Sequence, residues 1–278
     1  MTDATAEQQS NARVLCGFTY SQRRQVGDLE RAIADFTTVI DMPDATAEQQ
    51  ANARVLRSIA YCQRGDAGDV ERAIADCTAV IDMLDASTER RAMARIFRGI
   101  SHGRRELVQD EACAIADYTA VIVMPGASAE QRAKAHSNRG FAYGKRGQAG
   151  DVERAIADYT VVIDMPDANA EQRAMARDNR GFAYGERGQV GDLECEIADY
   201  TALIDMPDAN AEQRAEARVN RSVAYGKRGQ AGDVEFAIAD YDAIIAMPDA
   251  PAEQSEFARV NRDLLLKLNK LPSKKKQK

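Results

Sequence analysis

The side chains that most often do chemistry are scarce in this chain. Its two histidines, His102 and His136, have no Ser, Cys or carboxylate at the spacing of a nucleophile–base motif. Its cysteines form no Cys-x-x-Cys pair and match no zinc-ligand spacing. They are Cys16, Cys62, Cys77, Cys113 and Cys195. The sequence therefore predicts a protein that is not an enzyme and that carries no metal or other cofactor.

The segment Gly-Gln-Ala-Gly-Asp, at 147–151 and again at 229–233, has the small residues of a phosphate-binding loop. No predicted strand precedes it, so we interpret it as a turn between helices.

The distribution of charge along the chain narrows the classes of function that the protein can have. From Lys267 onward there are six lysines and no acid, which leaves 31 basic against 44 acidic residues in the rest. This acidic body disfavours nucleic-acid binding, and we expect a basic, disordered tail at 272–278.

Landmark residues repeat along the chain every 41 positions. Pro43, Pro125, Pro166, Pro207 and Pro248 are spaced by 41 or by twice 41. Fixed spacing of this kind is the signature of a repeat protein. We divide the chain into six repeats, at about 4–44, 45–85, 86–126, 127–167, 168–208 and 209–249. The sixth repeat is followed by the start of a closing helix that reaches 264, and we predict a capping helix over 250–271.

Each repeat predicts two helices. In the fourth, Ser128 and Gln131 form a capping box that begins the first helix, and Gly147 ends it as a left-handed C-cap. Asp151 has the side chain of an N-cap for the second helix. That helix carries an apolar face at helical spacing and ends at Pro166. Six pairs and the closing helix make about thirteen helices, so the predicted fold is an all-α solenoid.

The motif Asn138-Arg-Gly-Phe-Ala-Tyr143, followed by Ala155-Ile-Ala-Asp-Tyr159, resembles the bacterial form of the tetratricopeptide repeat. The resemblance covers about residues 4–264. The repeats have 41 residues instead of the family's about 34, and Sel1-like repeats are a second family with longer loops. The resemblance implies a right-handed superhelix of helix pairs whose concave groove binds a protein or peptide.

The resemblance also places partner-binding residues on the first helix of each repeat. Two adjacent positions of this helix, occupied by Val14 and Leu15 in the first repeat, change from apolar to polar residues along the chain. A third position, occupied by Phe18 in the first repeat, stays apolar. The predicted groove residues are Val14, Leu15, Phe18, Val55, Leu56, Ile59, Ile96, Phe97, Ile100, Asn138, Phe141, Asn179 and Phe182. These side chains either bind a partner segment or pack against the neighbouring helix.

One Asp in the second helix and one Arg in the first helix recur through the chain. The first repeat lacks the Arg, and the closing helix keeps it without a second helix of its own. The numbers balance if each Asp pairs with the next repeat. We therefore predict inter-repeat ion pairs between Asp35 and Arg57, Asp76 and Arg98, Asp117 and Arg139, Asp158 and Arg180, Asp199 and Arg221, and Asp240 and Arg262.

Together these features predict a non-enzymatic scaffold that binds a partner protein or peptide. A self-assembling structural protein is the alternative, with the apolar helix at Leu264–Leu271 as a possible contact between copies. An RNA-binding helical repeat is disfavoured by the acidic body. The N-terminal residues do not form a signal peptide, and no apolar run is long enough to span a membrane. We expect a cytoplasmic protein, because its cysteines show no disulfide pattern.

Overall fold

The computed structural model describes residues 5–23, 25–105, 107 and 109–269. The predicted tail at 272–278 and Leu271 lie outside these residues. The described part is all-α and contains thirteen helices, in which 18-residue helices alternate with helices of 13 or 14 residues. They are α1 (Ala6–Arg23), α2 (Asp28–Asp41), α3 (Ala47–Arg64), α4 (Asp69–Asp82), α5 (Thr88–Arg105), α6 (Asp110–Ile122), α7 (Ala129–Arg146), α8 (Asp151–Asp164), α9 (Ala170–Arg187), α10 (Asp192–Ile204), α11 (Ala211–Arg228), α12 (Asp233–Ile245) and α13 (Ala252–Asn269).

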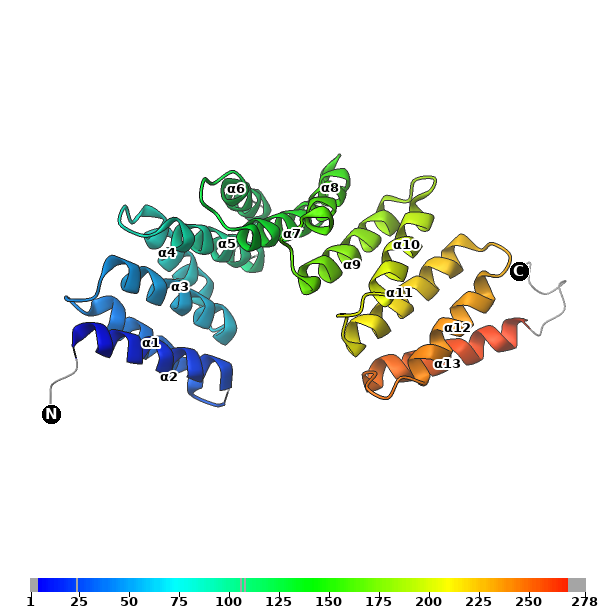
Figure 1. The fold of residues 1–278 in the computed structure, drawn as a ribbon, viewed down its shortest axis with the longest axis horizontal. Helices are drawn as coiled ribbons and strands as arrows, with labels where there is room; N and C mark the ends of the chain where they lie inside the picture. Colours follow the sequence, from blue (N-terminus) through cyan, green and yellow to red (C-terminus); the bar gives the residue numbers. More distant parts are fainter. Residues whose placement is uncertain (1–4, 24, 106, 108, 270–278) are drawn as a thin grey trace. The chain divides into compact units, whose positions relative to one another are not determined.

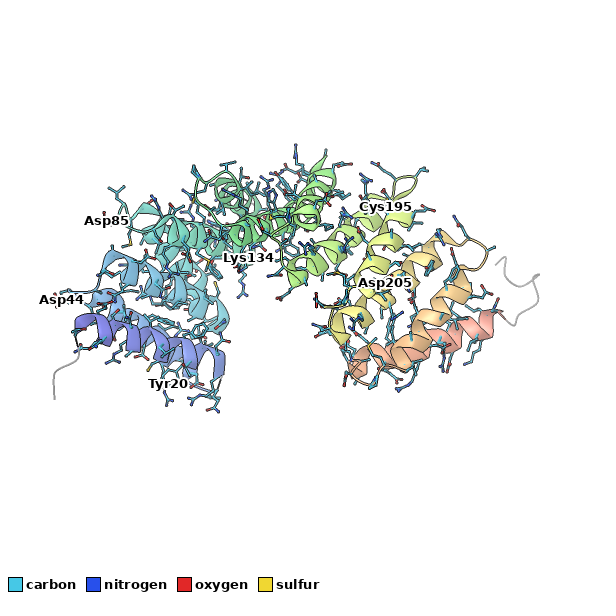
Figure 2. The ribbon with its side chains drawn as sticks, in the orientation of Figure 1. Tyr20, Asp44, Asp85, Lys134, Cys195 and Asp205 are labelled. Carbon is cyan, nitrogen blue, oxygen red and sulfur yellow. The ribbon has the colours of Figure 1, made fainter. Side chains whose placement is uncertain are left out.

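The helices belong to two compact units, and the division falls between Arg146 and Gly147, inside the fourth repeat. The first unit contains α1–α7 and the second contains α8–α13 (Figure 1). Within each unit, consecutive helices pack together, and so do the odd-numbered helices of neighbouring repeats. The junctions of the first unit that carry Asp44 and Asp85 lie on the same side of it (left in Figure 2). The predicted solenoid of helix pairs is confirmed.

Local sequence signals determine where the odd-numbered helices begin and end. At α3, Thr46 accepts from the amide of Gln49, and the Gln49 side chain accepts from the amide of Thr46. The same reciprocal bonds are present at the predicted boxes that start α1, α7, α9 and α11. Gly65 has a φ of 73° and ends α3, and Gly147 has a φ of 63° after α7. The predicted capping boxes and the glycine C-caps are therefore confirmed. They provide hydrogen-bond partners for backbone amides and carbonyls that the helix ends leave free.

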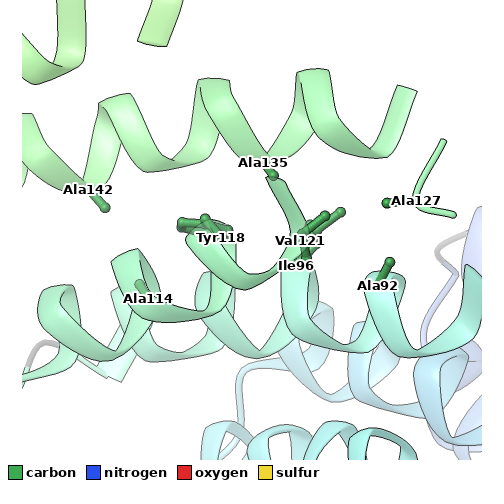
Figure 3. Close-up of a cluster of buried hydrophobic side chains, with 8 residues drawn as sticks. All are labelled: Ala92, Ile96, Ala114, Tyr118, Val121, Ala127, Ala135 and Ala142. Atoms are coloured by element: carbon green, nitrogen blue, oxygen red, sulfur yellow. The ribbon is translucent and has the colours of Figure 1, made fainter. Parts of the chain in front are cut away.

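The core consists of small and aromatic side chains where three helices meet. In the first unit, Ile96 of α5 and Tyr118 and Val121 of α6 pack beneath Ala135 of α7 (Figure 3). A Cβ on Gly99 would lie 2.7 Å from the Tyr118 ring, so this site requires glycine. One position of the first helix is alanine in every repeat, and from the second repeat onward this alanine is fully buried, at Ala53, Ala94, Ala135, Ala176, Ala217 and Ala258. Small residues therefore let the helices approach closely.

The predicted forward ion pairs are wrong where their partners are described. Arg57 donates from Nε and Nη2 to Asp76 of its own repeat, both at 2.7 Å. Its Nη1 reaches the preceding repeat and donates to Thr37 at 2.8 Å. The same arrangement pairs Arg98 with Asp117, Arg180 with Asp199 and Arg221 with Asp240. Each bidentate ion pair therefore fixes a hairpin, and a hydrogen bond to threonine joins the hairpin to its neighbour.

The ends of the array explain why counting Asp and Arg residues misled the prediction. Asp35 belongs to the repeat that lacks the arginine, and it pairs with Arg13 at 2.8 Å, a contact that recurs in other repeats, for example between Arg54 and Asp76. Arg262 has no second helix in its own repeat and pairs with Asp242 at 3.1 Å. Asp242 stands in the column where other repeats have threonine. Asp35 and Arg262 therefore each have another partner, so the totals balance without forward pairing.

A second Arg–Asp pair closes the turn within each hairpin. At the end of α3, Arg64 donates from Nη2 to Asp69 at 2.6 Å, and Asp69 also accepts from the loop amide of Asp66. The equivalent pairs are Arg23–Asp28, Arg105–Asp110, Arg187–Asp192 and Arg228–Asp233. This aspartate is the first residue of the second helix. Glycine, such as Gly150 before Asp151, is the N-cap, so the predicted aspartate cap is wrong.

Candidate partner-binding surface

One position on the first helices presents large apolar side chains to solvent. Phe18 is 46% exposed, Phe141 is 58% exposed and Phe182 is 63% exposed. Ile59 and Ile100 occupy the same position and are half-buried. We call these five residues the apolar column; Phe182 belongs to the second unit and the others to the first. A buried core position would not leave a phenylalanine more than half exposed at repeated sites.

The other two predicted groove positions, occupied by Val14 and Leu15 in the first repeat, differ in burial from the apolar column. Val55 and Ile96 are 1% and 3% exposed and belong to the core, so their assignment to a partner groove is wrong. Val14 is half-buried against the cluster of the first hairpin, as is Leu56. Val14, Val55 and Ile96 face the core of their own hairpin, whereas Leu56 packs against the core of the preceding hairpin. The apolar column lies one helical turn further along the same side of the helix as Val55 and Ile96.

The remaining predicted residues differ in their contacts. Phe97 is half-buried and packs against the core cluster of the second hairpin. Leu15 is 66% exposed and widens the apolar surface near Phe18. Asn138 and Asn179 are half-buried, and Asn179 donates to the carbonyl of Met175 on its own helix. Leu15 and the phenylalanines of the apolar column are therefore open to solvent, whereas Leu56 and Phe97 pack against core clusters, as do Ile59 and Ile100.

A cavity of about 510 Å³ lies next to the apolar column in the first unit. Ile100 of α5, Tyr118 of α6 and Phe141 of α7 contribute its apolar wall, and Ala114 also lines it. Arg104 and Lys145 contribute cationic groups, and Glu111 a carboxylate. The equivalent space between α11, α12 and α13 has about 170 Å³. The sequence reasoning missed this cavity, although the small residues that leave room for it recur at fixed spacing.

Groups with unusual proton affinity lie close to this surface in the second unit. Burial raises the pKa of Asp178 to about 6, and the neighbouring Glu216 carboxylate adds to the rise. Asn220 donates to Asp178 at 3.4 Å and opposes it. Burial also raises the pKa of Glu196, which is 4% exposed. Both acids stand at positions where other repeats have mainly apolar residues.

The histidine and cysteine side chains that could do chemistry take part in contacts that hold the fold together. His102 is buried, and its Nδ1 lies 3.2 Å from Asp110, which also binds Arg105. Cys77 is fully buried beside the Ser58 hydroxyl, and burial raises its pKa to about 12, so its thiol is not activated. No three metal-binding side chains gather among the described residues. None of the described helices is long and apolar enough to cross a membrane.

The chain matches no protein-family model and no curated protein sequence. The resemblance to tetratricopeptide repeats therefore stays a prediction that rests on the motifs alone.

Proposed function

We propose that this protein is a non-enzymatic scaffold that binds an apolar segment of a partner protein on the apolar column of its first unit, and that Phe182 presents the equivalent surface in the second unit. One observation carries the proposal, namely the exposure of Phe141 and Phe182 at equivalent positions of successive repeats. Burying a phenylalanine side chain stabilises a complex by about 1.5–3 kcal/mol. Aromatic side chains are also enriched among the residues that contribute most to binding energy.

The contrast between neighbouring positions supports this proposal over a packing role. Val55 and Ile96 lie one helical turn from the apolar column and are fully used by the core. Phe141 and Phe182, by contrast, keep more than half of their surface exposed, so a partner has apolar area left to bury. Within the first unit, successive repeats also present the column one after another, which suits an extended or helical segment with regularly spaced apolar residues. We place the protein in the cytosol, since its five cysteines are free thiols.

Alanine substitutions separate binding from packing. The partner is first isolated from the source cell, and its binding segment is mapped by peptide scanning. The double variant Phe141→Ala/Phe182→Ala should weaken binding of that peptide by about tenfold or more without lowering Tm. Phe97→Ala is the matched control, because it removes the same side chain from a packed site. It should lower Tm and leave the affinity of the folded protein unchanged. The opposite pattern would refute the proposal.

A second candidate function is self-association through α13. Val260, Leu264 and Leu268 are 57%, 51% and 46% exposed on this last described helix. A second copy of the chain would cover them. Against this, Glu256, Asp263 and Lys267 stand where α11 has Ala215, Ser222 and Gly226, which makes the outer face of α13 polar, as in a cap. Light scattering decides: a dimer that dissociates when the chain ends at Asn261 would favour self-association.

A further inference from the structure

In the second unit, a side chain of the protein itself occupies a space between helices, and the equivalent space in the first unit is open. Glu196 of α10 occupies the position that Ala114 occupies in α6, two repeats earlier. The Glu196 side chain is buried against the first helix of its hairpin. Its carboxylate oxygens lie 2.8 and 3.0 Å from the place where a Cβ on Gly185 would be. Glycine at 185 therefore makes room for a carboxylate on a short aliphatic stem.

The surroundings of this internal carboxylate show what the space accepts. Its Oε1 lies 3.9 Å from Nζ of Lys227, on the first helix of the next repeat. Its Oε2 has no hydrogen-bond partner within the described part of the chain. Glu186, whose charge opposes ionisation of Glu196, lies on the neighbouring turn of α9. The site thus holds an organic acid even with one cation and one anion beside it.

The first unit has the same walls and a more favourable charge pattern. Ala114 leaves the floor empty, and Gly103, the counterpart of Gly185, leaves open space. The positions of Glu186 and Lys227 are taken here by Arg104 and Lys145. Lys145 donates to the carbonyl of Gly103 at 3.1 Å, which holds its ammonium group beside the cavity. Arg104, in the same column of the preceding repeat, donates to the carbonyl of Cys62 on α3, so its guanidinium reaches toward the preceding hairpin from the edge of the cavity.

We infer that the cavity between α5, α6 and α7 binds a small organic acid. The carboxylate would be held by Lys145, with Arg104 adding positive charge at the edge, and its apolar stem would lie against Ile100, Tyr118 and Phe141. Even with Glu111 nearby, the two cations leave the cavity with a net positive charge. Its volume of about 510 Å³ falls within the range of about 300–1,000 Å³ typical of small-molecule sites. This inference is independent of the proposed scaffold function.

Binding is tested on the full chain by calorimetry and by NMR shift changes, with hexanoate, benzoate, 3-phenylpropionate and 4-phenylbutyrate as probes. At least one acid should bind with a Kd of about 1 mM or lower. The primary amide of the same acid, which has the same shape without the charge, should bind at least about tenfold more weakly. Lys145→Ala should weaken binding of the acid and leave binding of the amide unchanged.

A substitution copied from the sister repeat tests the location. Ala114→Glu should fill the cavity and abolish binding while the Tm stays close to that of the wild type, since Gly103 leaves space for the side chain. The control is Ala237→Glu, the same change at the equivalent position of α12, which should leave binding unchanged. The inference is overturned if no acid binds at about 10 mM, if the amides bind as well as the acids, or if Ala114→Glu binds like the wild type.

Discussion

Asp178 should destabilise the folded protein at neutral pH. Its side chain is half-buried on α9 beside α11, at a position where five other repeats and α13 carry Val, Ile or Ser. Burial raises its pKa to about 6 from the usual 3.8. In the unfolded chain the carboxyl ionises near its usual value. Between these two values the folded protein binds more protons than the unfolded chain, so its stability falls as the pH rises from about 4 to about 6.

The size of the effect follows from the two pKa values. Their difference corresponds to about 3 kcal/mol at neutral pH. The side chain retains some exposure to water and accepts a hydrogen bond from Asn220, so we expect about 1–2 kcal/mol in practice. Asp178→Asn keeps the shape and removes the charge. At pH 7 it should therefore raise Tm by about 2–8 °C.

The assay is thermal unfolding of Asp178→Asn and of the wild type by circular dichroism across this pH range. The gap in stability should be full at about pH 7 and nearly absent at about pH 4. Asp208→Asn is the control, because Asp208 is exposed in a junction between repeats. That change should shift stability by less than about 0.5 kcal/mol at either pH. The reasoning fails if Asp178→Asn is no more stable than the wild type at pH 7, or if its advantage persists at low pH.

The ion-pair pattern predicts two further results. Asp76→Ala should cost about 3 kcal/mol because it leaves the half-buried Arg57 unpaired, whereas Asp35→Ala should cost about 1 kcal/mol or less because its partner is exposed. A double-mutant cycle by urea unfolding should couple Arg57 to Asp76; coupling to Asp35 would instead restore the forward pairing. Asp242→Thr should destabilise the C-terminal end slightly, and this loss should shrink in high salt, because the pair with Arg262 is partly exposed. A loss that does not depend on salt would contradict this assignment.

Much of the fold follows from the sequence because its signals are local and repeated. Thr46 and Gln49 need only each other to start a helix, and Gly65 needs only its own conformational freedom to end one. The period of 41 residues then gives the number of helices without any knowledge of tertiary contacts. The same spacing also predicts which alanines, such as Ala94 and Ala135, are buried.

The errors arise where the direction of a side chain decides the contact. A column of residues shows that Arg57 recurs, but its spacing does not show whether its guanidinium faces Asp76 or Asp35. Counting failed because Arg13 and Asp242 provide partners at the two ends. The turn-closing pairs were missed although both residues recur five positions apart. Their bonds depend on the turn bringing the two helix ends together.

The assignment of groove residues shows the same division. Adjacent residues on a helix point about 100° apart, so Ile96 faces the core while Phe97 is only half-buried. Which of the apolar positions stays outside depends on the helices that pack around it. The cavity beside Phe141 follows from the absence of a large side chain at Ala114, and a sequence pattern does not display empty space.

Site-specific photocrosslinking tests the central claim most directly. A photoreactive phenylalanine analogue is placed at Phe18, Phe141 or Phe182, and at two control positions outside the apolar column. The controls are Leu84 and Val161, which are 90% and 42% exposed. If the column binds a partner, one protein should crosslink from the three column positions and not from the controls, and excess unlabelled protein should compete. Equal crosslinking from the controls, or none from the column, would contradict the proposed function.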